Sequence, residues 1–271
     1  MERIAVVTDT GSNLSFAQAK ELGIYLLPLQ ITIDETTYQD TLEISTQDIY
    51  NELANGKMPK TSMAAYQKIY DLFEELKKDY DTIFAVPLTN GLSTNASTMQ
   101  SIARELEMNV HVIDMYATCA LEKHVAIWIK RLVDEHKSSE EILKIIQPAI
   151  DESNSLILVK NLQHLKRGGR LTPMAATLAG LLKIYPILHI NKSTEGRIDV
   201  LNKVRTEKRA DAYAIDKIMD DIDIQHTHIY IIHSNFLEGA DHFKKCFIEK
   251  GVPEQNIHID YISSVIAVHT G

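Results

Sequence analysis

The sequence contains few of the features that mark several large classes of protein. Only two cysteines, Cys119 and Cys246, occur in 271 residues, and they form neither a CxxC pair nor a ligand cluster. A disulfide-stabilised extracellular scaffold is therefore not indicated. No apolar run is long enough to span a bilayer, and the N-terminus MERIAVVTDT lacks the layout of a signal peptide. We expect a cytoplasmic protein without stable membrane insertion.

Positive charge is also scarce. The chain has 28 Lys and Arg residues against 37 Asp and Glu, a formal net charge of −9, which disfavours nucleic acid as a partner. The phosphate-binding patterns GxxxxGK[ST] and GxGxxG are absent, so no nucleotide site is predicted. Eleven histidines are present, but their spacing to cysteines and carboxylates completes no metal site. We expect neither a metal nor another cofactor.

What the sequence does contain is an alternation of short β-branched runs with amphipathic helical patterns. The apolar runs 3–8 and 81–88 are each followed by a helical pattern, and the alternation continues along the chain. This order is typical of an α/β fold with largely parallel sheets. We place a domain boundary near residue 160, which gives an N-terminal α/β domain over 1–160 and a C-terminal α/β domain over 161–271.

Polar residues gather where loops leave the ends of the predicted strands, which is where α/β sheets bind ligands. Four such segments are TDTGSNLS (8–15), PKTSM (59–63), which we place at a helix start, PLTNGLSTN (87–95), with a flexible glycine, and VIAVHTG (265–271). Any one of these Ser, Thr, Asp and Asn residues can be an ordinary helix cap. Together they favour a binding site without identifying its ligand.

The stretch HLKRGGRLTP (164–173) places two adjacent glycines before Arg170. Adjacent glycines predict a shaped loop, and we expect Gly169 to have a positive φ and to lie close to Arg170. One interpretation is that Arg170 guards a bound anion. The alternatives are a solvated turn and a buried pairing of Arg170 with Asp9 or Asp114.

Eight segments together match one known family. They are VVTDTGSNLS, PLQITIDETTYQD, PKTSMAAYQKIYDLFEEL, VPLTNGLSTNASTMQSIARE, HVIDMYATCAL, NLQHLKRGGRLTPMAATLAGLLKIYPIL, KVRTEKRA and the terminal HTG. From end to end the chain resembles the DegV family of fatty-acid-binding proteins, which includes the fatty-acid-binding subunit of bacterial fatty acid kinase. The L-x-x-L-x-x-G-G-R block is the most specific of these motifs.

The resemblance implies a two-domain α/β architecture with parallel-rich sheets and a ligand cleft between the domains. One long-chain fatty acid would lie in an interdomain tunnel. By residue-wise correspondence, Thr61 and Ser93 would donate hydrogen bonds to its carboxylate, with Arg170 and His269 behind them. Four further residues are possible supports of this site: Asp9, Ser62, Asn95 and Asp114.

The family member most like this chain presents the carboxylate to a separate ATP-dependent kinase subunit, which forms an acyl phosphate for phospholipid synthesis. The resemblance therefore implies a lipid-binding, substrate-carrying subunit and not an enzyme. Cations near the GGR block and on the segment NKVR would dock the kinase, and these are Lys166, Arg167, Lys203 and Arg205. The alternatives are a stand-alone lipid carrier or sensor and a small-molecule hydrolase that uses Ser93, for which the spacing identifies no base.

The sequence departs from the family pattern at several positions. Ser93 is followed by Thr94 and Asn95 where the family has a glycine, and Met115 replaces a serine. Larger residues also occupy small-residue positions of the next segment, at Leu121 and Lys123, and Tyr185 precedes Pro186. We expect these departures to affect the width of the pocket and the acyl preference more than the carboxylate end.

Overall fold

The most continuous apolar runs form the centre of a four-stranded parallel sheet in the computed structural model, which describes residues 2–180 and 184–271. Strand β1 (Ile4–Asp9) is buried along its whole length because β2 (Tyr25–Leu27) and β6 (Thr82–Val86) flank it. Strand β7 (Asn109–Val112) completes the order β2-β1-β6-β7. Strands covered on both faces are expected to be apolar, as residues 4–7 of β1 and 83–86 of β6 are.

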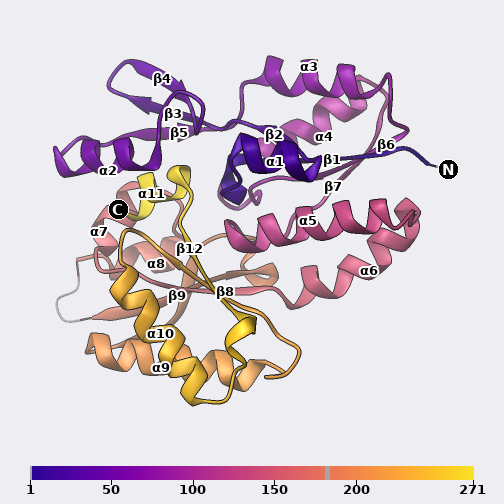
Figure 1. Cartoon of the computed structure of the whole chain (residues 1–271). Coiled ribbons are helices and arrows are strands. Elements are labelled where there is room, and N and C mark those ends of the chain that lie inside the picture. Colours follow the sequence, from indigo (N-terminus) through magenta and orange to yellow (C-terminus); the bar gives the residue numbers. More distant parts are fainter. Residues whose placement is uncertain (1, 181–183) are drawn as a thin grey trace.

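Helices cover both faces of this sheet (Figure 1). Side chains of α3 (Tyr66–Leu76) and α4 (Asn95–Glu105) share one core cluster with Ala5 and Val7 of β1. Side chains of α5 (Ala120–Asp134) and α6 (Ser139–Glu152) pack with Ile4 and Val6 in a second cluster. Successive residues of β1 therefore serve opposite faces, as the period of two in a strand requires.

Two helices begin at cap signals that are local in the sequence. Helix α1 (Phe16–Leu22) begins after Ser15, whose side chain accepts from the backbone N–H of Gln18, and ends at Gly23 with φ +67°. Helix α2 (Thr46–Ala54) begins with a capping box, in which Ser45 and Asp48 satisfy each other's backbone N–H groups. Both caps could be recognised because they depend on residues only three positions apart.

We expected the segment PKTSM at a helix start, and this prediction is wrong. Residues Lys60–Ser62 form strand β5, which pairs antiparallel with β3 (Gln30–Ile33), and α3 begins only at Tyr66. Strand β4 (Thr36–Gln39) flanks β3 on its other side. The pairing places Thr61 opposite Ile31, which is fully buried. Tertiary pairing of β3 thus overrides the local helix-cap signal.

The second lobe contains two sheets (Figure 1). Strands β8 (Asn154–Leu158), β9 (Tyr185–Asn191) and β10 (Asp199–Val204) are antiparallel in the order β10-β9-β8. Strands β11 (Ile229–His233) and β12 (Ile257–Tyr261) form a parallel pair. The two-domain α/β prediction is confirmed, with parallel pairing in the four-stranded sheet and in β11–β12. Strand β8 pairs with β9 and therefore belongs to a sheet of the second lobe. A domain boundary drawn between the sheets would lie before Asn154, whereas we placed it near residue 160.

Helices complete the second lobe and connect it to the first. Helices α9 (Glu207–Asp221) and α10 (Leu237–Glu249) pack on its strands, and short 3₁₀ turns span Thr10–Ser12, Lys192–Thr194 and Glu254–Asn256. The final helix, α11 (Ser264–Thr270), returns to contact α2 and β5 of the first lobe. No helix among the described residues is long and apolar enough to cross a membrane.

Two short helices flank the double glycine. Helix α7 (Leu162–Arg167) replaces the loop that we expected before the glycines, and α8 (Pro173–Leu178) begins with a proline in its first turn. The helical pattern that starts at Pro173 extends in the sequence to residue 183, and its last part, 181–183, lies outside the described residues. Helix α7 contacts α11, so the GGR segment lies where the last helix meets the second lobe.

A buried carboxyl group in the first lobe should make stability depend on pH. Asp40 is fully buried, neither carboxylate oxygen has a hydrogen-bond partner among the described residues, and burial raises its pKa to about 6. The unfolded chain releases this proton at lower pH, so the destabilisation develops between pH 4 and 6. At roughly 1.4 kcal/mol per pKa unit, it reaches about 3 kcal/mol above that range.

We therefore expect Asp40→Asn to raise the free energy of unfolding at pH 7.5 by up to that amount and to change it little at pH 4. Urea denaturation at the two pH values measures the difference. An equal effect of the substitution at both pH values would show that the charge on Asp40 is not its cause.

Candidate functional site

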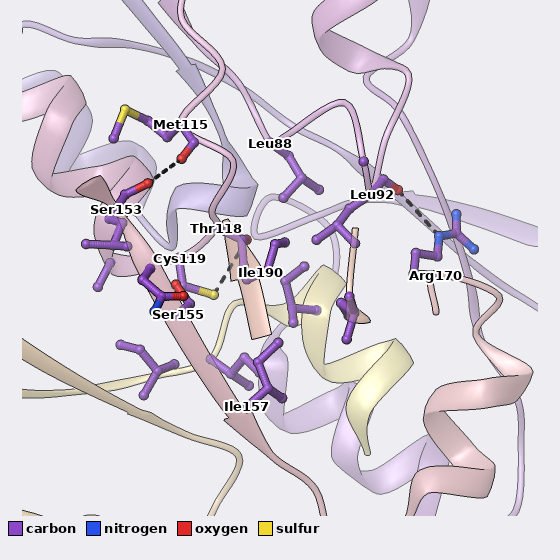
Figure 2. Close-up of a pocket in the computed structure, with 18 of the residues that line it drawn as sticks. Leu88, Leu92, Met115, Thr118, Cys119, Ser153, Ser155, Ile157, Arg170 and Ile190 are labelled. Atoms are coloured by element: carbon purple, nitrogen blue, oxygen red, sulfur yellow. Dashed lines mark hydrogen bonds between the residues drawn. The ribbon is translucent and has the colours of Figure 1, made fainter. Parts of the chain in front are cut away.

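A cavity of about 980 Å³ lies between the two lobes. Its walls come from both, including the loops after β5 and β6, the start of α5, strands β8 and β9, and α11. Figure 2 shows its apolar lining, to which Leu88, Leu92, Met115, Ile157 and Ile190 contribute. A cavity with this lining favours a ligand with a substantial hydrocarbon portion.

All four residues predicted to bind a carboxylate line this cavity. Thr61 comes from β5, Ser93 from the loop between β6 and α4, Arg170 from the segment after α7, and His269 from the last turn of α11. The fold thus brings together side chains from four segments that are far apart in the sequence. They form a polar group on an otherwise mainly apolar wall.

Each of the two hydroxyl groups has a hydrogen-bond partner behind it. Thr61 Oγ1 lies 2.7 Å from His269 Nε2, and the backbone N–H of Asn95 donates to Ser93 Oγ at 3.2 Å. A carboxylate only accepts hydrogen bonds. If Nε2 of His269 carries the proton and donates to Thr61, both hydroxyls accept from behind and keep their own hydrogens for a ligand.

His269 is neutral at physiological pH. Burial lowers its pKa to about 4, and the neighbouring Arg170 and His164 lower it as well. His164 is a structural histidine, as the sequence suggested, because its Nε2 donates to the backbone oxygen of Val268 at 2.9 Å. This bond fixes α11 against α7 and therefore holds His269 in place. His269 accordingly orients Thr61 and does not supply charge.

Arg170 supplies the positive charge of the site. Its Nε and one terminal nitrogen donate to the backbone oxygens of Leu92 and Gly168, at 3.4 and 2.6 Å. It forms no ion pair with any carboxylate of the described residues, and burial lowers its pKa. An unpaired, half-buried guanidinium favours binding of an anion.

The alternative pairing of Arg170 with an aspartate is wrong. Asp9 accepts instead from the backbone N–H groups of Gly11 and Leu88 and from the amide of Asn95. Asp114 accepts from two backbone N–H groups, those of Asn90 and Tyr116. Both carboxylates stabilise loops of the first lobe, so neither neutralises the arginine.

The two adjacent glycines have different roles. Gly169 has φ +74°, as expected, but a Cβ there would meet no atom within 4 Å, so it does not occupy tight space near Arg170. At Gly168 a Cβ would lie 2.7 Å from Nδ1 of His269. The first glycine therefore permits close packing against the histidine, and the second permits the turn.

The predicted supporting residues lie at different distances from the cavity. Asn95 and Asp9 are fully buried behind Ser93, joined by a 2.6 Å hydrogen bond from the Asn95 amide. Ser62 lines the cavity but is exposed and donates to Gln30. Asp114 fixes the turn at Asn90 and does not line the cavity. Asn95 thus supports Ser93 directly, and Asp9 does so through Asn95.

The sequence interpretation missed Glu122. This α5 side chain is fully buried beside Asp9, and burial, followed by the charge of Asp9, raises its pKa well above the ordinary value. Burial and the neighbouring Asp9 carboxylate therefore both disfavour the charged form of Glu122. Its position could have been noticed, because it lies on the same helical stripe as the buried Val125, Ala126 and Ile129.

A hydrolytic role for Ser93 finds no support in its contacts. Its Oγ is hydrogen-bonded only to the backbone N–H of Asn95 among the described residues. His269, the histidine of the same site, is bonded to Thr61 instead. A serine nucleophile needs a base within hydrogen-bond reach. Within residues 2–180 and 184–271, no three His, Cys, Asp or Glu side chains are placed to hold a metal ion either.

The four cations predicted to dock a partner are exposed. Lys166 and Arg167 end α7, four and three residues before Arg170 along the chain, while Lys203 is the penultimate residue of β10 and Arg205 follows the strand. None of them forms an ion pair with another described residue, in contrast to Lys160, which pairs with Glu207. Their charges are therefore free to interact with another molecule.

The fold and this site define a class of protein: a two-domain α/β protein with a mainly apolar interdomain cavity that carries two hydroxyl donors beside Arg170. The chain belongs to the DegV family, described as uncharacterised, whose model matches residues 3–271. It is 31% identical to a DegV domain-containing protein of Halalkalibacterium halodurans over 277 aligned residues, which cover 100% of this chain and 96% of that protein.

Solved structures of the family have the same fold. A fatty acid binding DegV family protein from Streptococcus agalactiae superposes with a TM-score of 0.91 at 28% identity, covering 100% of this chain and 96% of that one. DegV, a fatty acid binding protein from Bacillus subtilis, gives a TM-score of 0.86 at 26% identity with the same coverage. The two-domain architecture is therefore that of structurally known fatty-acid-binding proteins.

Proposed function

We propose that this chain binds one long-chain fatty acid in the cavity between its lobes. The observation that carries the proposal is the combination of apolar walls with two oriented hydroxyls and an unpaired Arg170 at one place. A carboxylate there would accept from Thr61 and Ser93 in the field of the arginine. Leaving such a group without partners in a partly dry site would be very costly.

The acyl tail would supply most of the affinity. At roughly 0.8 kcal/mol per buried CH₂, a sixteen-carbon tail contributes about 12 kcal/mol before the costs of ordering. Several kcal/mol of this gain are lost when the ligand and the wall become ordered. The polar group therefore fixes the position of the ligand, and the tail keeps it bound.

Native mass spectrometry of the purified chain tests the proposal directly. We expect an added mass equal to that of a fatty acid, lost on denaturation and restored when the delipidated protein is incubated with hexadecanoic or octadecenoic acid. A protein that carries no adduct and takes up neither acid would refute the proposal.

Replacing Ser93 by Ala should weaken fatty acid binding about tenfold or more, because a hydrogen bond to a charged group contributes roughly 1.5–3 kcal/mol. The melting temperature of the lipid-free protein should change little, since Ser93 receives only one bond, from Asn95. Competition with a fluorescent fatty acid measures the affinity. Ser97→Ala, on the exposed side of α4, is the matched control. Unchanged binding by Ser93→Ala would leave Ser93 only a structural role in the loop.

We further propose that the bound carboxyl group is presented to a separate kinase subunit, which forms an acyl phosphate with ATP. What supports this is that Lys166 and Arg167, which are exposed and form no ion pair with another described residue, lie within four residues of Arg170 on a chain of net charge −9. Exposed local cations on an acidic protein favour docking of an acidic partner. A carrier or sensor that works without a kinase is the remaining candidate.

Charge reversal of Lys166, Arg167 or Arg205 to Glu should separate the two steps. We expect each variant to bind fatty acid normally and to be a poor substrate for a fatty acid kinase subunit with ATP, because attraction is replaced by repulsion. Acyl phosphate formation and lipid content are measured on the same samples, with Lys68→Glu on α3 as control. If a variant lost its bound lipid and its acyl phosphate formation to the same extent, these cations would belong to the cavity site and not to a docking surface.

A further inference from the structure

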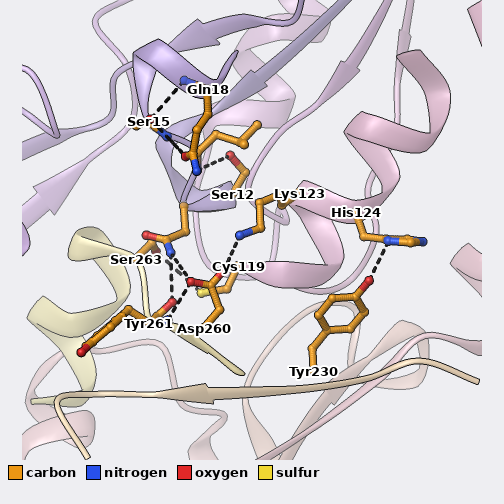
Figure 3. A network of polar contacts seen from close by, with 12 residues as sticks. Ser12, Ser15, Gln18, Cys119, Lys123, His124, Tyr230, Asp260, Tyr261 and Ser263 are labelled. Atoms are coloured by element: carbon orange, nitrogen blue, oxygen red, sulfur yellow. Dashed lines mark hydrogen bonds and ion pairs between the residues drawn. The ribbon is translucent and has the colours of Figure 1, made fainter. Parts of the chain in front are cut away.

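A second group of polar side chains lines the cavity apart from the carboxylate site. His124 lies in the first half of α5, and His228 and Tyr230 lie at the start of β11, so the group is built from both lobes. Figure 3 shows His124 and Tyr230 directed toward one another across the interface. None of these side chains contacts Thr61, Ser93, Arg170 or His269 through a hydrogen bond.

The run of β11 separates this group from the carboxylate site. At the carboxyl end of the strand, Ser234 Oγ donates to the backbone oxygen of Gly271, directly after α11 and its His269. His228 precedes the strand and lies five residues before His233. At about 3.3 Å per residue, His228 lies about 16 Å from His233 along the strand. A long acyl chain whose carboxylate lies at His269 would reach the second group with its distal half.

The second group has spare hydrogen-bonding capacity. Tyr230 Oη lies 2.7 Å from His124 Nδ1, and His228 Nδ1 lies 2.8 Å from His258 Nε2, with the two imidazoles stacked at 5.1 Å between centroids. Each of these bonds uses one hydrogen. Nε2 of His124 and a lone pair on the Tyr230 oxygen have no further partner among the described residues.

The charges around the group favour a neutral ligand atom. Burial, followed by the neighbouring histidines, lowers the pKa of His124, and burial and His228 lower that of His258. The neutral forms of these two imidazoles are therefore favoured. Carboxylates of Glu152 and Asp221 also line the cavity, so a second carboxylate on the ligand would be repelled.

We propose that the cavity accepts fatty acids that carry a neutral oxygen, a hydroxyl or keto group, on the distal half of the chain, and that His124 and Tyr230 bind this oxygen. The inference rests on the proposed fatty acid function. A plain hydrocarbon tail would remove water from these polar groups without replacing its hydrogen bonds. A hydroxyl group would donate to one partner and accept from the other.

Competition against a fluorescent fatty acid on the delipidated protein tests the inference. We expect 12-hydroxyoctadecanoic acid to bind about three- to tenfold more tightly than octadecanoic acid, the range expected for one net neutral hydrogen bond. Tyr230→Phe should bring this ratio close to one. His124→Leu provides a second variant should the first destabilise the interface. Tyr66→Phe, whose hydroxyl bonds Glu105 outside the cavity, should retain the wild-type ratio.

The outcomes separate the two levels of the proposal. If neither acid displaces the probe, the proposed function itself fails. If both bind and the wild-type ratio is one or below, or if the preference survives both substitutions, the distal oxygen site is refuted. An equal preference for 2-hydroxyoctadecanoic acid, which has the same formula, would assign the effect to the carboxylate end and would also refute it.

Discussion

Replacement of Arg170 by Met should reduce fatty acid affinity at least about thirtyfold while leaving the lipid-free protein nearly as stable as wild type. Removing one member of a buried, hydrogen-bonded charge pair costs roughly 2–5 kcal/mol. In the free protein, however, the guanidinium has no carboxylate partner and is half-buried, which is itself unfavourable. A methionine of similar length removes this charge and keeps most of the packing.

Affinity is measured by fluorescent displacement, and stability by the melting temperature of delipidated samples. Arg209→Met, on the exposed surface of α9, controls for the loss of one positive charge from the whole chain. A fall in melting temperature with retained lipid binding would contradict the prediction, because it would make Arg170 a structural residue that joins the loops of Leu92 and Gly168.

Loss of binding without loss of stability is the signature of a binding residue. A side chain selected for stability is satisfied in the free protein, as Asp9 is by Gly11, Leu88 and Asn95. Within the part of the chain that the structure describes, Arg170 has only two backbone oxygens as partners. The sequence could predict that an arginine follows the glycines, but not its partner, because Asp9, Asp114 and a ligand were equally compatible with the local pattern.

Features set by neighbours in the chain were predictable from sequence. The capping box of Ser45 and Asp48 and the α1 stop at Gly23 depend on a few consecutive residues, and the buried strand β1 on a continuous apolar run. Thr61 was expected at a helix start and lies in a strand, because its conformation is decided by pairing with β3, thirty residues earlier. The site residues themselves came from the resemblance to a family.

Contacts between backbones could not be predicted in this way. Gly91 was interpreted as a flexible residue in a loop, yet it lies against the turn at Gly196 of the other lobe. Nothing near Gly91 in the sequence indicates this neighbour, which is more than a hundred residues away. Glycine leaves the same local signal whether it provides flexibility, a positive φ or close approach, and only the folded chain distinguishes them.

Gly91→Ala should therefore force the two lobes apart and abolish tight fatty acid binding. A Cβ at this position would lie 2.1 Å from the backbone carbon and oxygen of Gly196 and 2.5 Å from the nitrogen of Arg197. Backbone atoms cannot rotate away as a side chain can, so one lobe must shift. The turn at Gly196 is also tightly packed, because a Cβ at Gly196 would lie 2.0 Å from Thr89 Oγ1.

The shift should affect stability and binding together, in contrast to Arg170→Met. Overpacking costs typically 1–3 kcal/mol and sometimes more, so we expect the melting temperature to fall by several degrees. Asn90, Gly91 and Arg197 also line the cavity, so separation of these segments opens its wall to water. The lipid content of the purified variant and its melting temperature with and without added octadecenoic acid measure both effects.

Gly251→Ala separates crowding from backbone strain. Gly251 has φ +95°, and a Cβ there would meet no atom within 4 Å, so its replacement adds only the cost of the conformation, about 1 kcal/mol. We expect this control to lose some stability and to keep its lipid. Because its lost stability is local to the end of α10, it cannot mimic an opening of the interface. A Gly91→Ala protein with wild-type melting temperature and lipid content would show that the two lobes do not meet at this turn, and that the loop before Ser93 is free to move.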